Sequence, residues 1–189
     1  MQKGTSGREK LIIAGISLAQ QVGVGGLSLR KVASACGMSC AAPYKHFKDK
    51  QAFVLAMLEY IKGEWNMRQQ ALLSACDSDA RTRLLAISMG YINFLLDHPH
   101  FRTIIMMRQQ DLTGEQRRAK GELSQLTQEL IRVYCEKVGM ADDVRERKTL
   151  VVRSLIYGAA LLVDSGELAR DARTMSLFSD AISREFELN

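Results

Sequence analysis

The sequence predicts an all-α protein, and three observations lead to this fold class. Proline occurs only twice in 189 residues, so helix-breaking residues are scarce. Apolar residues recur at helical spacing along most of the chain, and no stretch shows the alternation typical of a half-buried strand. Leu, Ala, Met and Arg, which favour helices, are abundant. The length fits an N-terminal head of residues 1–50 and a helical body of residues 51–189.

The head contains the most informative segment, residues 27–50, with the sequence LSLRKVASACGMSCAAPYKHFKDK. Ser28 is a suitable N-cap for a short helix, because its hydroxyl can accept from a free backbone N–H. Gly37 predicts the end of that helix, since glycine adopts a left-handed conformation without steric cost. Ser39 can cap a second short helix over about residues 40–47. Two short helices around a glycine turn are typical of a helix-turn-helix that enters the DNA major groove.

The second short helix and the residues after it suit contact with a duplex. Residues 40–42 have small side chains, which allow a close approach to base edges. Pro43 is tolerated because it falls near the first turn. Asp49 can cap a further helix, which places Lys50 in its first turn, where the ammonium and free N–H groups favour phosphate.

The run from Arg8 to Phe53 resembles the DNA-binding domain of the tetracycline-repressor (TetR) family of bacterial transcription regulators. The motifs that carry the resemblance are Leu29-Arg30-Lys31-Val32-Ala33, Gly37-Met38-Ser39 and Ala42-Pro43-Tyr44-Lys45-His46-Phe47-Lys48-Asp49-Lys50. The resemblance implies a three-helix head, with a first helix over about residues 8–22, and a C-terminal domain for effector binding and dimerisation. The side chains expected at DNA are Ser28, Arg30, Ser39, Cys40, Ala41, Ala42, Tyr44, Lys45, His46, Lys48 and Lys50.

Within this set the resemblance implies that Arg30 reaches a base and that Tyr44, His46 and Lys50 meet phosphates or groove edges. Residues 40–42 depart from richer family members, because they offer almost no hydrogen bonds to bases. We therefore expect DNA shape, together with Arg30, Tyr44 and Lys45, to supply much of the specificity.

The charge distribution agrees with a DNA-binding head. Residues 1–50 hold eight Lys and Arg against two Asp and Glu, whereas the rest of the chain holds 18 against 19. The whole positive excess of the chain, +5, therefore belongs to the head. A basic head beside a nearly neutral body is suited to phosphate binding.

Several classes of protein are disfavoured. No segment approaches the roughly 20 apolar residues that span a bilayer, and the first residues lack the apolar core of a signal peptide, so we expect a cytoplasmic protein without a membrane partner. No catalytic triad or phosphate-binding glycine loop is visible, so we expect neither an enzyme nor a cofactor. His98 and His100 flank Pro99 without further ligands, which predicts no metal site. Cys36 and Cys40 leave a redox-responsive regulator open as an alternative.

The body reads as a series of amphipathic helices. Their expected ranges are 49–75, 80–97, 101–111, 115–138, 147–164 and 174–186, with residues 141–143 starting the fifth. Large, adaptable side chains are expected to surround one cavity for a hydrophobic or aromatic effector, as the resemblance implies. These residues are Trp65, Tyr91, Phe94, Phe101, Met106, Met107 and Tyr157.

The last two helices predict a homodimer. Residues 147–164 are apolar over much of the helix circumference, more than one buried face requires. The resemblance places a four-helix dimer interface here, and we assign to it Leu155, Gly158, Ala159, Leu162, Leu177, Phe178, Ala181 and Ile182.

Taken together, the sequence predicts a ligand-responsive repressor that leaves a pseudo-palindromic, double-stranded operator when a small effector binds. The alternatives are an activator, a redox-responsive regulator of the same fold, or a small-molecule carrier that does not bind DNA.

Overall fold

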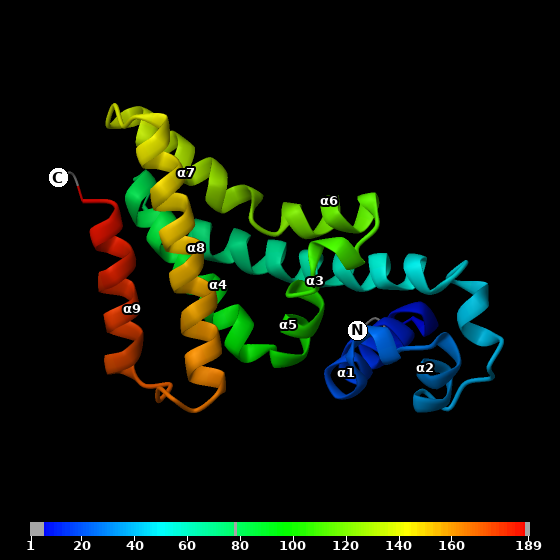
Figure 1. The fold of residues 1–189 in the computed structure, drawn as a ribbon. Helices are drawn as coiled ribbons and strands as arrows, with labels where there is room; N and C mark the ends of the chain where they lie inside the picture. The colour runs from blue at the N-terminus through cyan, green and yellow to red at the C-terminus, as the bar shows by residue number, and fades with distance from the viewer. Residues whose placement is uncertain (1–5, 78, 188–189) are drawn as a thin grey trace. The chain divides into compact units, whose positions relative to one another are not determined.

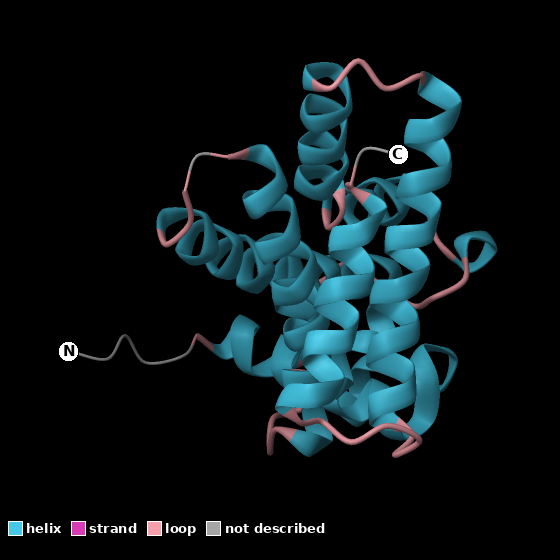
Figure 2. Cartoon of the chain, turned by 90° about the vertical axis from the view of Figure 1, so that its left-hand side faces the viewer, coloured by secondary structure: helices cyan, strands magenta, loops and turns pink. Residues whose placement is uncertain are grey.

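The structure is a computed structural model that describes residues 6–77 and 79–187. Over these residues the regular secondary structure consists of α-helices and two short 3₁₀ helices, without a strand, as Figure 2 shows. The prediction of an all-α fold is confirmed.

Figure 1 labels the α-helices in chain order. With the two 3₁₀ helices, η1 and η2, the elements are α1 (Gly7–Gly26), α2 (Leu29–Ala35), η1 (Ala42–Lys45), α3 (Lys50–Ser74), α4 (Ala80–Asp97), α5 (Pro99–Ile105), η2 (Gln109–Asp111), α6 (Gly114–Glu122), α7 (Gln125–Lys137), α8 (Asp142–Asp164) and α9 (Ala172–Glu185).

The described chain forms two compact units. The first, which we call the head unit, contains the residues up to Glu64 together with residues 98–122. The second, the bundle unit, contains residues 65–97 and the residues from Leu123 onward. This division differs from the expected boundary after residue 50, because the first half of α3, α5 and α6 pack with the head.

The head unit is built around α1. Leu11, Ile12 and Ile16 are buried on one side of this helix, which packs against α5 and α2. Gly15 allows α3 to approach closely, since a Cβ there would lie 2.3 Å from the Phe53 ring. Gly23 leaves helical geometry with φ +69°, so regular helix ends at Val22, as expected from the sequence.

The bundle unit is built around α4, which packs against α7, α8 and α9. The last turn of α9 is held by donors from three other helices, because Arg81, Tyr134 and Lys148 all donate to its backbone carbonyl groups. These donors satisfy carbonyls that a helix end leaves without intrahelical partners. The end of α9 is therefore fixed to the rest of the bundle unit.

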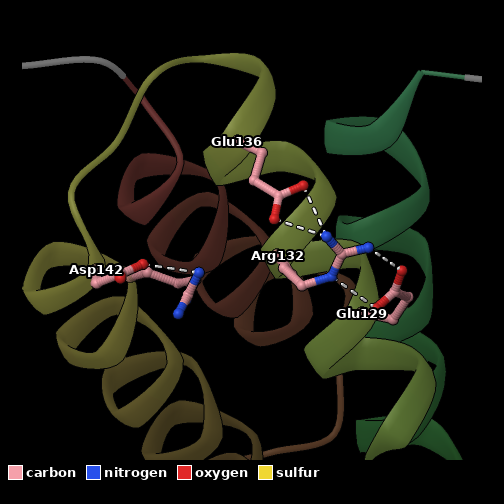
Figure 3. Close-up of polar contacts among 5 residues, drawn as sticks. Glu129, Arg132, Glu136 and Asp142 are labelled. Carbon is pink, nitrogen blue, oxygen red and sulfur yellow. Dashed lines mark hydrogen bonds and ion pairs between the residues drawn. The ribbon is translucent and has the colours of Figure 1, made fainter.

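The outer face of α7 carries an exposed group of ion pairs. Arg132 lies between Glu129 and Glu136, with N···O distances of 2.5 and 2.6 Å, as Figure 3 shows. The Arg132 guanidinium lowers the pKa of Glu129 below its ordinary value. Exposed pairs of this kind contribute little to stability, so we do not regard this cluster as a functional site.

Three predicted elements differ from the structure. The second short helix is not an α-helix over residues 40–47 but the 3₁₀ helix η1, in which the N–H groups of Tyr44 and His46 donate to carbonyls three residues back. The expected helix over residues 101–111 stops at Ile105. The expected helix over residues 115–138 is divided into α6 and α7, and at the break the Leu123 carbonyl accepts a hydrogen bond from Trp65 Nε1 at 3.0 Å.

Candidate nucleic-acid interface

The turn between α2 and η1 has the geometry expected from the sequence. Ser28 Oγ accepts from the backbone N–H of Lys31 at 3.2 Å and so caps α2. Gly37 has φ +65°, and the N–H of Met38 donates back to the Ala33 carbonyl at 2.9 Å. These bonds reverse the chain within three residues and fix the start of the next segment.

Two buried residues anchor the segment that contains η1. Pro43 and Phe47 lie in the interior of the head unit, and the Phe47 ring meets the Phe53 ring edge-on with centroids 4.8 Å apart. The Arg8 guanidinium lies 5.3 Å from the centroid of the Phe47 ring, within the range of a cation–π contact. The backbone between Pro43 and Phe47 is therefore held at both ends.

The side chains between these anchors are exposed. Tyr44 exposes 53% of its surface, and Lys45 and His46 are also exposed. The segment therefore presents an aromatic ring, a cation and an imidazole in consecutive positions.

All eleven residues expected at DNA belong to the head unit. Eight are exposed, namely Arg30, Ser39, Cys40, Ala41, Tyr44, Lys45, His46 and Lys48. Ser28, Ala42 and Lys50 are partly buried. The Sγ atom of neighbouring Cys36 donates to the Lys10 carbonyl at 3.7 Å, and Cys40 is exposed.

Lys50 has a partner that the sequence did not reveal. Its ammonium donates to the Gly25 carbonyl at 2.8 Å, at the end of α1. Lys31 donates to the next carbonyl, that of Gly26, at 3.4 Å. Cations at the C-terminal end of a helix are favourable, because the last carbonyls carry partial negative charge. Lys50 thus joins α1 to the first turn of α3 in the absence of DNA.

The seven expected effector residues are divided between the two units. Phe101, Met106 and Met107 belong to the head unit, whereas Trp65, Tyr91, Phe94 and Tyr157 belong to the bundle unit. The latter four form a packed aromatic cluster, in which the ring centroids of Trp65 lie 4.8 Å from Tyr91 and 5.2 Å from Phe94.

Three buried polar groups in the described part of the bundle unit lack a partner, and of these residues the sequence had singled out only Tyr91. Within the described residues, Gln69 Nε2, Ser88 Oγ and Tyr91 Oη are buried without a hydrogen-bond partner. Burial also raises the pKa of Tyr91 well above its ordinary value of 10.0. The available signal was a serine on the otherwise apolar face of α4, since buried polar groups usually find partners.

The surface shared by α8 and α9 is apolar and hollowed. A cavity of about 400 Å³ is lined by residues of both helices, including Leu155, Gly158, Leu162 and Phe178. Leu150, Leu161 and Leu177 stand exposed on these two helices. Of the other residues expected at a dimer interface, Ala159 is buried and lines the same cavity, Ala181 is partly buried, and Ile182 is buried.

The described helices include none that is both long and apolar enough to cross a membrane. Over the same residues, no group of three or more His, Cys, Asp or Glu side chains is arranged to hold a metal ion.

Comparison with known proteins finds similarity to bacterial transcription regulators. Residues 11–57 match the family described as bacterial regulatory proteins, tetR family. The uncharacterized HTH-type transcriptional regulator YerO of Bacillus subtilis (strain 168) is 24% identical over 179 residues, which cover 90% of this chain and 61% of YerO. The HTH-type transcriptional repressor NemR of Escherichia coli (strain K12) is 30% identical over 91 residues, 48% of this chain and 46% of NemR. The match to YerO thus spans less than two thirds of that protein, and the match to NemR less than half.

A solved structure shows the same fold. The crystal structure of a TetR family transcription regulator from Marinobacter aquaeolei VT8 superposes with a TM-score of 0.77 at 16% identity, over 94% of each chain.

The glycine turn and the anchored η1 segment form a helix-turn-helix, and the helical bundle has the fold of the solved regulator. Residues 11–57 are thus similar to the tetR family of bacterial regulatory proteins, which confirms the resemblance inferred from the sequence.

Proposed function

We propose that this protein is a DNA-binding transcriptional regulator, and specifically a repressor that a small hydrophobic or aromatic effector releases from a pseudo-palindromic operator. The observation that carries the proposal is the exposed segment of Tyr44, Lys45 and His46, held between buried Pro43 and Phe47. A rigid backbone with exposed cationic and aromatic side chains can enter a groove without ordering a loop first. Such a regulator acts in the cytoplasm and catalyses no reaction.

The side chains of the head divide into two kinds of contact. Lys48 and Lys45 are suited to phosphates, which fix the position of a protein on the duplex but carry no sequence information. Arg30 can read a guanine edge with two hydrogen bonds, and alanine methyl groups in the turn can meet a thymine methyl. Specificity therefore depends on few direct contacts and on the shape of the duplex.

A mobility-shift titration at several salt concentrations tests the DNA-binding role. The DNA is the region that flanks the coding sequence, and the variant is Lys48→Ala. Loss of one phosphate contact should weaken binding to all sequences and reduce the salt slope by about one unit. Lys137→Ala removes the same charge from an exposed position in the bundle unit and should leave the slope unchanged. If wild type and Lys48→Ala show the same salt dependence of DNA affinity, Lys48 does not contact a phosphate.

For the effector, we propose the aromatic cluster of the bundle unit. Supporting observations are the buried hydroxyl groups of Ser88 and Tyr91, which have no hydrogen-bond partner among the described residues, and the packing of the Tyr91 ring against Trp65. A ligand that opens the cluster could satisfy these groups while its apolar part replaces ring contacts. Trp65 is the only tryptophan in the chain, so its fluorescence should change with aromatic compounds that release DNA. If a compound releases the protein from DNA without changing Trp65 emission, the effector does not bind at the aromatic cluster.

The proposed operator symmetry follows from a homodimer. A two-fold axis through the apolar surface of α8 and α9 would present two heads, and paired heads read half-sites about one DNA turn apart. A reporter gene behind the flanking DNA distinguishes the two regulatory signs, since deletion of a repressor raises expression and deletion of an activator lowers it.

A further inference from the structure

The head unit contains a cavity that shares one residue, Lys50, with the side chains expected at DNA. Its volume is about 590 Å³, within the range of sites for small organic ligands. The end of α1 forms one side through Val24 and Gly25, and the start of α3 contributes Lys50 and Val54. The segment from Thr103 to Asp111 forms the remaining side.

The lining of this cavity has an apolar part and a cationic part. Val54 is buried, and Val24 and Met107 are partly buried, so these side chains can receive an aromatic or aliphatic group. Lys120 donates to the Met107 carbonyl, which fixes this part of the wall. Methionine side chains adapt to ligands of irregular shape, because the thioether chain is flexible.

The cationic part consists of Lys50 and Arg108, with Asp111 as the acidic residue of the lining. Arg108 Nε lies 3.0 Å from an Asp111 carboxylate oxygen. A guanidinium has five N–H groups and an ammonium has three, so both cations retain donors beyond the bonds to Asp111 and to the Gly25 carbonyl. The three charges sum to one positive charge, which favours an anion.

We propose that this cavity binds an amphipathic organic anion, an aromatic or aliphatic carboxylate or sulfonate, whose charged end meets Lys50 and Arg108. The inference rests on the proposed function in one respect: Lys50 is also an expected phosphate contact. An anion that engages Lys50 competes with DNA for the same ammonium, so the ligand lowers DNA affinity directly at the head. This route is independent of the aromatic cluster in the bundle unit.

A pair of fluorescent probes tests the cavity without DNA. The anionic probe is 8-anilinonaphthalene-1-sulfonate, and the neutral probe is N-phenyl-1-naphthylamine, which has the same aromatic frame without the sulfonate. Arg108→Gln should weaken binding of the anionic probe roughly three- to fivefold, as expected for an exposed charge pair, and leave the neutral probe unaffected. Arg147→Gln, which removes an exposed cation of the bundle unit, should change neither affinity.

The same probe tests competition in mobility-shift titrations. Arg108→Gln should bind DNA as the wild type does, but a several-fold higher concentration of the anionic probe should be needed to release it. Unchanged binding of the anionic probe to Arg108→Gln would overturn the site. Probe binding that leaves DNA affinity intact would overturn the competition at Lys50. If the protein binds no DNA at all, the proposed function is refuted. The fluorescence titrations would still show whether the cavity binds the anionic probe.

Discussion

At the scale of single residues, Gln116 shows how much a buried amide can hold together. Its Oε1 accepts from the N–H of Thr113 at 3.0 Å, while its Nε2 donates to the carbonyl and the side-chain oxygen of Gln51 at 2.9 and 2.8 Å. The side chain is fully buried. Gln116 therefore caps α6 and fastens the start of that helix to the first turn of α3.

Replacement of Gln116 by leucine should be costly although the two side chains have similar size. Gln116→Leu leaves the N–H of Thr113 without its acceptor and places an apolar group against the Gln51 oxygens, so we expect a loss of about 1–3 kcal/mol in the free energy of unfolding. Urea denaturation followed by circular dichroism measures this loss. Gln70→Leu, on the exposed side of α3, is the matched control and should change stability by less than about 0.5 kcal/mol. If both variants change the free energy of unfolding equally, the hydrogen bonds of Gln116 contribute nothing to stability.

The sequence could predict residue roles that depend on near neighbours, but not those that depend on distant segments. Ser28 as a cap and Gly37 as a left-handed residue follow from local backbone chemistry, and the structure has both. The bond from Lys50 to the Gly25 carbonyl joins residues 25 positions apart, and the burial of Gln116 requires α3. Neither has a local signal.

At the scale of elements, the N-cap of α9 makes its stability dependent on pH. Asp171 accepts from the backbone N–H of Thr174 at 2.8 Å, and this bond lowers the pKa of Asp171 below its ordinary value of 3.8. A carboxyl group with a depressed pKa in the folded state stabilises the protein above its unfolded-state pKa. The contribution is lost as the pH falls through the folded-state pKa.

Asp171→Ala should therefore lower the urea midpoint at pH 6, and the difference from wild type should shrink below pH 3.8. Urea titrations at pH 6, 4 and 3 measure the difference. Asp180→Ala, on an exposed position beyond the first turn of α9, provides the control and should not show this narrowing. A difference that stays constant down to pH 3 would mean that the Asp171 charge plays no part in the cap.

The glycine turn provides a second prediction about an element. Gly37 has φ +65°, whereas Gly63 lies within α3, where an added Cβ would meet nothing within 4 Å. Gly37→Ala should destabilise the head by about 1–2 kcal/mol because the left-handed conformation strains an L-residue. Gly63→Ala should stabilise it by about 0.4–1 kcal/mol through the unfolded state. Thermal unfolding of both variants tests this difference in sign, and two shifts in the same direction would contradict it.

Element boundaries could be predicted where capping residues are strong. The range of α4 agrees with expectation, and α3 begins one residue later than expected, after its Asp49 cap. The prediction failed where a helix is interrupted without proline or a left-handed glycine, as between α6 and α7. There the Leu123 carbonyl accepts from distant Trp65, a contact that no local preference predicts.

At the scale of the whole molecule, the sequence and the structure divide the chain differently. The predicted boundary after residue 50 follows the motif, but compactness depends on packing, and α5 and α6 join the head unit because α1 contacts α5 and Gln116 contacts Gln51. The expected effector residues were chosen for their size alone. They consequently fall in both units, because size gives no information about which helix packs where.

The apolar surface of α8 and α9 leads to the last prediction. Leu177 exposes 61% of its surface there, beside the cavity formed with Leu155 and Phe178. A lysine at this position would have to be buried in a dimer but would be solvated in a single chain, so Leu177→Lys should favour single chains. Sedimentation at about 10 μM should show the mass of one chain for the variant and of two for the wild type.

Binding of Leu177→Lys to DNA with two half-sites should weaken by about tenfold or more, because the second head is no longer tethered, while binding to a single half-site should not change. Met67→Lys, which alters an equally exposed residue on α3 (60%), should remain a dimer. If Leu177→Lys sediments as the wild type does, another surface joins the two copies.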